Sequence, residues 1–445
     1  MRQLTIALAC ALTAALFAAA PAAAVLQSPN VTLQAKLPEA VSAIGARFSP
    51  DGNTMYVTGA TGLQIYDVSN AAAPVRLSTL PLPHFENEDV DVGRDTVVIS
   101  NDPSFSTVGA IYLIDVSNPS APSLRKTLVT KLPVGGGTLG VQSTDNGHIA
   151  NCIAGCDYLY TTGTEEGLTI YDIRDLDNPR YVKKFTMPVP KGGTQGGFTH
   201  DVYVDSTGIA WVSGRDGTFG YDTTDPENPA LVYRTDENVV NTGGGLPGDD
   251  GSGPLDFLHH NVMRVSDDTL AITEEDYAKP TCEGQGSLQT WRITDEHNSD
   301  GSIKLVLADQ WTTELNELAT LQGRSPATGN CSAHWFDEDR GLIAQGWYDQ
   351  GVRFLDVSNP GDIRQVGFYA TAGTFWAAYF APSDASGQTV YGLDTAGGID
   401  VLHIDRGGAA LPTRTVPVTT ADLAKGSPRG TPTQRWGYAC PLPGV

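Results

Sequence analysis

The chain has 445 residues, with 28 Lys and Arg against 51 Asp and Glu, and a formal net charge of −23. A surface this acidic repels the phosphate backbone, so we exclude a nucleic-acid partner, whereas it attracts cations. The length exceeds what one hydrophobic core usually supports, so we expect several domains or an array of repeats.

The N-terminal segment MRQLTIALACALTAALFAAAPAAA has the layout of a cleaved secretory signal peptide. Arg2 precedes an apolar run, and residues 22–24 form a small-residue cleavage site. Pro21 interrupts the run and no second long apolar stretch follows, so we expect no membrane span. We therefore predict a signal peptide at 1–24 and a secreted, extracellular protein, with the cell surface or the periplasm as alternative destinations.

Five cysteines remain after export, which is an odd number. An oxidising compartment favours disulfides. We expect a local bridge between Cys152 and Cys156 and a longer one between Cys282 and Cys331. Cys440 is then either free or paired elsewhere.

A short pattern recurs seven times along the chain, at intervals of 47 to 70 residues. The clear copies are GLQIYDVSNAAAP (62–74), AIYLIDVSNPSAP (110–122), GLTIYDIRDLDNP (167–179), GTFGYDTTDPENP (217–229) and GVRFLDVSNPGDI (351–363). Weaker copies are SLQTWRITDE (287–296) and GIDVLHIDRGG (398–408). Each copy alternates with period two and ends in Asx and proline residues, which predicts a strand followed by a turn.

Two more apolar strands precede each copy and a shorter one follows it, so each unit contains four strands. This arrangement predicts an all-β fold, a seven-bladed β-propeller of four-stranded antiparallel blades over residues 25–410. The segment VTLQAKLP (31–38) resembles an outermost strand without partners of its own, and we expect it to close the ring. Residues 411–445 are predicted to be a C-terminal extension packed on or near the closure blade. An open solenoid would need caps, and the sequence offers no candidate for one.

The segments IYDVSN, LIDVSN and FLDVSN resemble the repeats of LVIVD-repeat proteins, which are secreted or surface-exposed bacterial propellers. The resemblance spans essentially the whole mature chain and implies the fold and the location, but little about activity. The copies with Trp291 and with His403 depart from the motif.

The first strand of each unit carries a column of chemically distinctive residues. Two positions before the aligned apolar residue stand Ala46, Glu88, His148, His200, His260, His334 and Ala378. Because the first strand of a propeller blade is the innermost one, these side chains are expected to form a ring around the axis. Several fixed imidazoles are a good ligand set for zinc, copper, nickel or iron.

We therefore predict that His148, His200, His260 and His334 bind a transition metal. Glu88 is the candidate catalytic base, a further ligand or an orienting group. The alanines would leave one side of the ring open for a substrate or water. The alternative is that the histidines line a water-filled channel, and His259 competes with His260 for the ring position.

Other segments are weaker candidates. Glycine-rich stretches precede three of the histidines and predict surface connections around one mouth of the channel. An apolar wall or core packing are the two roles expected for four aromatic residues, Trp335, Trp347, Phe375 and Trp376. The acidic segments NEDVDVGRD and EEDY match no calcium-binding motif, and we interpret both as solvated turns.

Two functions stay open. The first is a metal-dependent oxidoreductase or oxygenase acting on a small-molecule substrate. Copper or iron would suit redox chemistry, and zinc would suit hydrolysis. The ring is similar to the four-histidine iron site of carotenoid-cleaving oxygenases. THDVYVD and CSAHWF faintly resemble selenium-binding protein/methanethiol oxidase, which is copper-dependent.

The second function is a non-catalytic, monomeric extracellular scaffold that binds a cell-surface protein or glycan through its loops.

Overall fold

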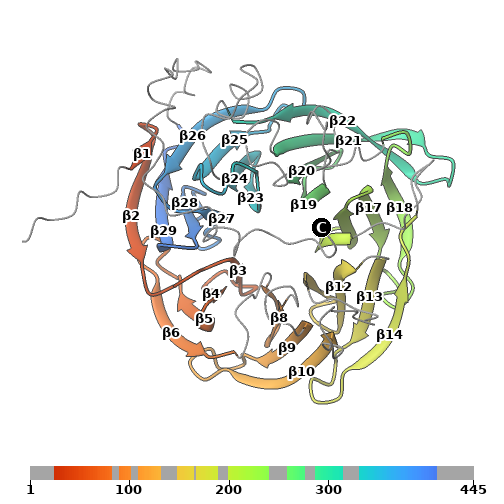
Figure 1. Ribbon diagram of the computed structural model, residues 1–445, viewed down its shortest axis with the longest axis horizontal. Helices are drawn as coiled ribbons and strands as arrows, with labels where there is room; N and C mark the ends of the chain where they lie inside the picture. Colours follow the sequence, from red (N-terminus) through yellow and green to blue (C-terminus); the bar gives the residue numbers. More distant parts are fainter. Residues whose placement is uncertain are drawn as a thin grey trace, which may run out of the picture.

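The computed structural model describes residues 25–82, 90–101, 109–131, 148–164, 167–188, 199–239, 258–275, 286–313 and 330–407. Within these ranges the regular elements are all β-strands, and no helix occurs. The strands are arranged as a ring of sheets around a central axis (Figure 1). The all-β propeller prediction is therefore confirmed.

The described strands group into seven four-stranded units, which is consistent with seven blades. Blades one to three are β3 (Gly45–Phe48), β4 (Thr54–Gly59), β5 (Gly62–Asp67), β6 (Val75–Leu80); β7 (Val90–Gly93), β8 (Thr96–Asn101), β9 (Gly109–Asp115), β10 (Ser123–Lys131); β11 (Ala150–Ile153), β12 (Tyr158–Thr164), β13 (Gly167–Asp172), β14 (Arg180–Phe185). Blades four and five are β15 (Thr199–Val204), β16 (Ile209–Gly214), β17 (Gly217–Asp222), β18 (Ala230–Thr235); β19 (Leu258–Ser266), β20 (Thr269–Glu275), β21 (Ser287–His297), β22 (Ile303–Trp311). Blades six and seven are β23 (Phe336–Asp339), β24 (Leu342–Gly346), β25 (Val352–Asp356), β26 (Arg364–Ala370); β27 (Phe375–Phe380), β28 (Thr389–Asp394), β29 (Gly398–Ile404).

The repeated sequence pattern corresponds to the third strand of each blade. In the clear copies the aspartate that ends this strand accepts a hydrogen bond from the backbone N–H two residues later. Asp67 Oδ1 accepts from Ser69 N at 2.9 Å, and Asp356 Oδ1 accepts from Ser358 N at 2.9 Å. These Asx turns reverse the chain toward the outermost strand, which is why Asp and Ser recur at this spacing. The same hydrogen bonds lower the pKa of the Asp67 carboxyl.

The N-terminal strand β2 (Val31–Leu37) closes the ring. It pairs antiparallel with β29 and becomes the fourth strand of the seventh blade, as predicted. Lys36 Nζ lies 2.6 Å from the buried carboxylate of Asp400 on β29. The short strand β1 (Leu26–Gln27) adds a fifth strand to blade six, and β18 pairs in parallel with β22, so that blades four and five form one eight-stranded sheet.

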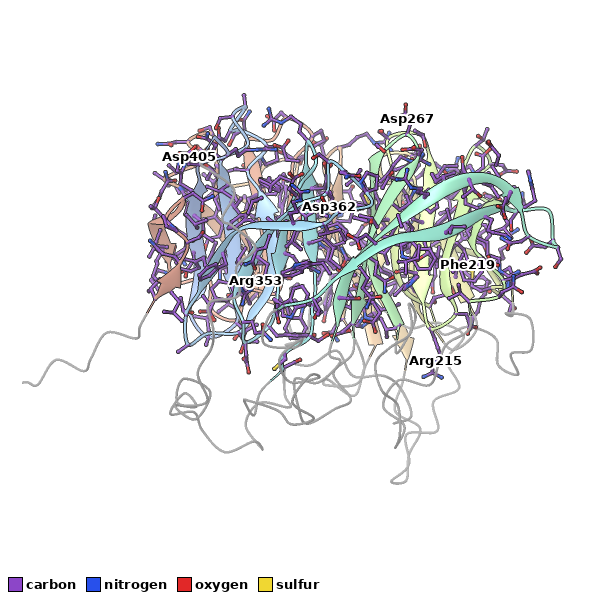
Figure 2. All side chains as sticks on the ribbon, turned by 90° about the horizontal axis from the view of Figure 1, so that it is seen from above. Arg215, Phe219, Asp267, Arg353, Asp362 and Asp405 are labelled. Atoms are coloured by element: carbon purple, nitrogen blue, oxygen red, sulfur yellow. A yellow bond between two sulfur atoms is a disulfide. The ribbon has the colours of Figure 1, made fainter. Side chains whose placement is uncertain are left out.

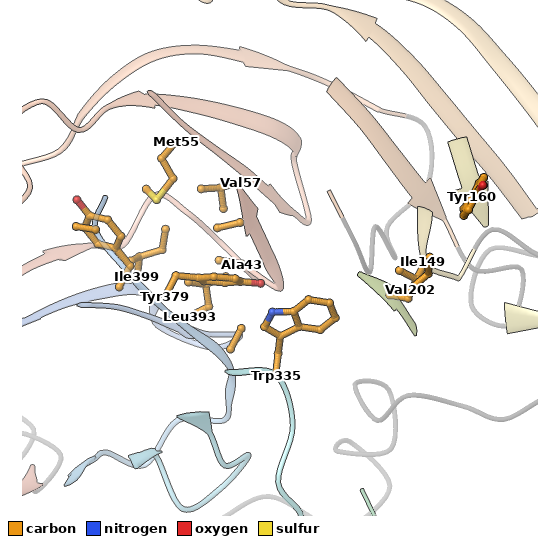
Figure 3. Close-up of a cluster of buried hydrophobic side chains, with 14 of the residues drawn as sticks. Ala43, Met55, Val57, Ile149, Tyr160, Val202, Trp335, Tyr379, Leu393 and Ile399 are labelled. Carbon is orange, nitrogen blue, oxygen red and sulfur yellow. The ribbon is translucent and has the colours of Figure 1, made fainter. Parts of the chain in front are cut away.

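Exposure is greatest on the outermost strands. The third strand β5 is buried along nearly its whole length, whereas the outermost strand β6 is mostly exposed. A blade is packed between two neighbours, so both faces of its inner strands are apolar. Figure 3 shows part of the largest core cluster, in which Trp335 lies between Ala43 and Tyr379 on one side and Ile149 and Val202 on the other.

Two predicted segments, the signal peptide at 1–24 and the extension at 411–445, lie outside the described residues and stay predictions. No helix long and apolar enough to cross a membrane occurs in the described part of the chain.

Substituting Val31 with alanine tests the closure by β2. Val31 is fully buried against blade six and seven residues, so the loss of two methyl groups is expected to lower the free energy of unfolding by about 2 kcal/mol. Val75 is 61% exposed on the outermost strand of blade one. Val75→Ala is therefore expected to change the free energy of unfolding by less than about 0.5 kcal/mol. Equal losses in urea unfolding would contradict a structural role for β2.

Candidate functional site

The four predicted histidines occupy the same place at the entrance of four consecutive inner strands. His200 and His260 each lie where the register of the first strand shifts by one residue, which is a β-bulge. His148 and His334 lie just before β11 and β23. Bulges redirect side chains at sheet edges and beside active sites. The inner strands therefore aim their histidines at one region near the axis.

The site lies toward one face of the disc. Thr199, the neighbour of His200, pairs with Gly214 at the end of β16. The next residue, Arg215, lies on the face opposite Asp267 and Asp405 (Figure 2). The histidines are therefore nearer to the face that carries Arg215.

The imidazole rings are in contact with one another and almost completely buried. Nε2 of His148 lies 2.8 Å from Nε2 of His200. The ring centroids are 4.4 Å apart for His148 and His200, and 4.1 Å apart both for His200 with His260 and for His260 with His334. All four residues are at most 2% exposed. The histidines thus form a continuous arc across blades three to six.

Hydrogen bonds to the next blade determine which nitrogen two of the rings present. Nδ1 of His200 lies 3.2 Å from the carbonyl oxygen of His260, and Nδ1 of His334 lies 2.6 Å from that of Trp376. A carbonyl only accepts, so each Nδ1 carries the proton and donates. Nε2 of His200 and of His334 is then the unprotonated nitrogen, which is the form that binds a metal.

Hydroxyl groups hold the backbone of the same four residues. In each case a Ser or Thr on the second strand of one blade donates to the carbonyl of the histidine in the next blade. The pairs are Ser100 with His148 (2.6 Å), Thr162 with His200 (2.6 Å), Ser213 with His260 (2.7 Å) and Thr273 with His334 (3.0 Å). The arc is therefore positioned by the contacts that join the blades.

Burial keeps His200, His260 and His334 neutral. It is the main reason why the pKa values of His200, His260 and His334 lie well below the usual value of 6.5. Neighbouring imidazoles lower these pKa values further, because two positive charges this close repel each other. Neutral imidazole is the form that binds metals.

Blade seven contributes Trp376 to the ring, and the prediction of Ala378 is wrong. The register of β27 shifts at Trp376, as β15 shifts at His200, and the Trp376 carbonyl accepts from His334 Nδ1. Ala378 packs in the core between blades six and seven. The expected alignment used Phe380, but an alternating apolar pattern fits equally well when it is moved by two residues.

Blade one shows the same displacement. Ile44 N donates to the carbonyl of Thr58 at 3.1 Å, which corresponds to the bond from His334 N to Gly346, so Ile44 is the ring residue and the prediction of Ala46 is wrong. Ile44 packs with Tyr348 and Trp376 in a buried cluster. The side of the ring that was expected to be open is therefore filled by apolar side chains.

His259 is not a member of the arc. Its Nδ1 lies 2.9 Å from Thr218 Oγ1, and its ring packs edge-on against Trp291 at 5.2 Å. His260 therefore has the ring position. Glu88, the predicted catalytic base, lies outside the described residues.

Sequence reasoning missed one carboxylate in the site. Glu275 is fully buried at the end of β20, and one of its oxygens lies within 4.8 Å of ligand nitrogens of His200 and His260. The distance from Glu275 Oε2 to His260 Nε2 is 3.7 Å. The interpretation of EEDY as a solvated turn is wrong for Glu274 and Glu275, which are 3% and 0% exposed. The available signal was that the second strands β4, β16 and β24 end in glycine, whereas two acids end β20.

Tyr348 is the second residue that was missed. Its hydroxyl donates to Glu275 Oε1 at 2.5 Å, and its ring lies 4.8 Å from that of His334. Its φ of 23° is unusual for a residue other than glycine, and such conformations cluster at functional sites.

The four aromatic residues have different roles. Trp376 lies 4.6 Å from His334, and Trp335 meets His260 edge-on at 6.1 Å, so both line the arc. Arg47 lies 5.1 Å from the Trp335 ring, a cation–π contact. Trp347 and Phe375 are fully buried and pack in the core, which is the second of the two roles expected for these residues.

The predicted disulfide between Cys152 and Cys156 is confirmed. Cys331 is disulfide-bonded as well. Its predicted partner Cys282, and Cys440, lie outside the described residues.

Comparison with known proteins supports the repeat and the fold. Residues 50–79 and 109–130 match the LVIVD repeat. The chain is a β-propeller that carries LVIVD repeats. No curated protein matches it. The similarity to selenium-binding protein/methanethiol oxidase stays a prediction.

Two similar solved structures are also propellers. The Cps50 (Swd1) β-propeller domain of Myceliophteria thermophila has a TM-score of 0.54 at 10% identity, and the match covers 84% of this chain and 100% of that domain. The WD40 repeats of RRP9 have a TM-score of 0.52 at 10% identity, with 85% and 98% covered. At this identity the likeness of the LVIVD-repeat propeller to both shows the fold alone.

A glycine beside His148 provides a test of how the arc is packed. A Cβ on Gly163, whose φ is +86°, would lie 2.2 Å from His148 Cβ. Gly163→Ala is expected to lower the free energy of unfolding by about 1–3 kcal/mol more than Gly208→Ala, because it adds overpacking to the backbone strain. Gly208 has a φ of +82° and its nearest atom is 3.9 Å away, so it carries the strain without the clash. Equal losses in urea unfolding would show that His148 is not packed as described.

The lowered pKa values predict a pH dependence of the metal-free protein. The unfolded chain protonates His334 near pH 6.5 and the folded chain does so only at lower pH. Its contribution to stability is therefore complete above pH 6.5 and is lost as the pH falls below that value. Each such histidine steepens the loss by up to about 1.4 kcal/mol per pH unit. The slope of the free energy of unfolding against pH, measured by urea unfolding between pH 6.5 and 5, counts the protons that the chain takes up when it unfolds. We expect His334→Gln to reduce this number by about one. An unchanged slope would contradict a neutral, buried His334.

Proposed function

We propose that this LVIVD-repeat propeller binds one transition-metal ion at the arc of histidines near its axis. The observation that carries the proposal is the convergence of buried imidazoles: the Nε2 atoms of His148 and His200 are 2.8 Å apart, and ligand atoms of His260 and Glu275 lie within 4.8 Å of that of His200. Two nitrogens bound to one tetrahedral ion are about 3.3 Å apart. Small side-chain rotations would bring these atoms to ligand distances.

The electrostatics of the site favour a cation. Glu275 is a fully buried carboxylate surrounded by imidazoles whose lowered pKa values keep them uncharged. A divalent ion would place positive charge beside this carboxylate without protonating a histidine. The net charge of −23 would attract cations over longer distances.

The predicted ligands were His148, His200, His260 and His334, and we retain all four as candidates with Glu275 added. His334 differs from the others because its ring also contacts Tyr348 and Trp376. A redox-active ion such as iron or copper would supply electron transfer to a metal-dependent oxidoreductase reaction on a small molecule, and zinc would supply an acidic water for hydrolysis.

We further propose that the protein is exported after removal of residues 1–24.

A scaffold role is the alternative. The outermost strands of several blades expose apolar side chains, among them Val75 and Leu77 on β6, Leu124 on β10 and Tyr181 on β14. Exposed apolar residues on repeat proteins can contact a partner at the cell surface. In this case the histidines would only pack and line the axis, and the protein would contain no metal.

Elemental analysis of protein purified from the exported fraction tests the proposal. We expect about one transition-metal ion per chain. The double variant His200→Ala, His334→Ala is expected to lose the ion, whereas His259→Ala should keep it. His259 is an equally buried histidine that contacts Thr218 and Trp291 instead of the arc.

A wild-type protein that is metal-free as isolated and takes up no Co²⁺, Zn²⁺, Fe²⁺ or copper would overturn the proposal. Loss of metal from His259→Ala to the same extent as from the double variant would also contradict it, because a general disturbance of the fold would then explain both. Activity requires a further result, namely turnover that follows the metal content.

A further inference from the structure

The turn between β24 and β25 in blade six is longer than the corresponding turns of blades one and four. It runs from 347 to 351, whereas the corresponding turns of blades one and four contain only residues 60–61 and 215–216. The additional length carries Tyr348 over the histidine arc. Blade six thus adds a side chain to the site that the basic repeat does not provide.

Several contacts hold this turn in place. Trp347 Nε1 donates to the carbonyl of Cys331 at 2.5 Å, and Phe375 N donates to the carbonyl of Tyr348 at 2.8 Å. Tyr348 and Phe375 also form an isolated β-bridge. The turn is therefore anchored to the segment before β23 and to the first strand of blade seven.

The Tyr348 side chain is held by packing and by a hydrogen bond. Its ring packs 4.8 Å from His334 and 5.5 Å from Trp376, and it is fully buried. Its hydroxyl donates to Glu275 Oε1 at 2.5 Å, across the boundary between blades five and six. Hydrogen bonds of this kind, from a hydroxyl to a carboxylate, are short and strong.

This bond determines how Glu275 presents itself to the histidines. With Oε1 held by Tyr348, Oε2 is the oxygen that lies 3.7 Å from His260 Nε2. We propose that Tyr348 is a positioning residue that fixes Glu275 as a ligand through one oxygen, completing a site of imidazole nitrogens and one carboxylate. The proposal rests on the proposed metal function and deepens it.

The donor set indicates the class of ion. An anionic oxygen is a hard donor that favours divalent ions such as Fe²⁺, Co²⁺ and Zn²⁺, whereas Cu⁺ favours soft sulfur ligands. The site contains no sulfur ligand among the described residues. We therefore assign it to a divalent ion, and among the redox metals to iron rather than to monovalent copper.

Co²⁺ binding to the full exported chain tests the role of Tyr348. The dissociation constant is measured by competition with a chromophoric chelator, and the visible absorption of bound Co²⁺ reports its ligand geometry. Tyr348→Phe is expected to weaken binding 10–100-fold, the usual effect of removing a group that orients a ligand, and to change the Co²⁺ spectrum. Glu275→Gln is expected to weaken binding further, and Tyr348→Phe should have little additional effect in that background.

Tyr369→Phe is the matched control. Tyr369 is also fully buried, and its hydroxyl donates to a buried carboxylate, Asp400 Oδ2, at 2.8 Å, in the interface of blades six and seven. This variant should bind Co²⁺ with the wild-type dissociation constant and spectrum.

Three results would overturn the assignment. The first is that Tyr348→Phe has the dissociation constant and the absorption spectrum of the wild-type Co²⁺ complex. The second is that Tyr348→Phe and Tyr369→Phe weaken Co²⁺ binding equally. The third is that the wild-type protein binds Cu⁺ more tightly than Co²⁺. Failure of the wild-type protein to bind Co²⁺, Zn²⁺, Fe²⁺ or copper would overturn the proposed metal function as well, so the two failures are distinguishable.

Discussion

Each four-stranded blade has two apolar faces, and it can bury both only when another blade lies on either side. The ring has to close for every blade to satisfy this condition, and β2 closes it by pairing with β29. Because the first strands are the innermost, closure also brings together residues that are far apart in the chain. The histidine arc is a consequence of this packing, since His148 and His334 are 186 positions apart and still belong to one cluster.

The contacts that join the blades are also those that orient the site. A hydroxyl of one blade holds the carbonyl of the next histidine, and the Nδ1 of His200 or His334 donates to the carbonyl of the residue after it in the ring. These bonds place the proton of both imidazoles on Nδ1 and leave Nε2 unprotonated, and burial keeps both imidazoles neutral. Stability and the orientation of the imidazoles therefore depend on the same interactions, and a substitution in the arc is expected to affect both.

Tyr348 and Glu275 show how one repeat becomes different from the others. Blade five continues its second strand with two acids, and blade six lengthens the following turn by a few residues. Neither change disturbs the four-stranded frame. Together they place a carboxylate and a buried cluster of Ile44, Tyr348 and Trp376 beside the imidazoles.

The amino-acid sequence by itself determined the repeat, the strand order within each blade and the closing strand, because period-two alternation and Asx turns are local properties. It also identified the column of histidines. It could not place the ring residues of blades one and seven, because an alternating pattern is unchanged by a shift of two residues, and Ile44 and Trp376 were missed in favour of Ala46 and Ala378. Only the tertiary structure decided that Glu275 is buried against His260 and that Tyr348 holds it, since both contacts cross blade boundaries or strand ends that no local pattern describes.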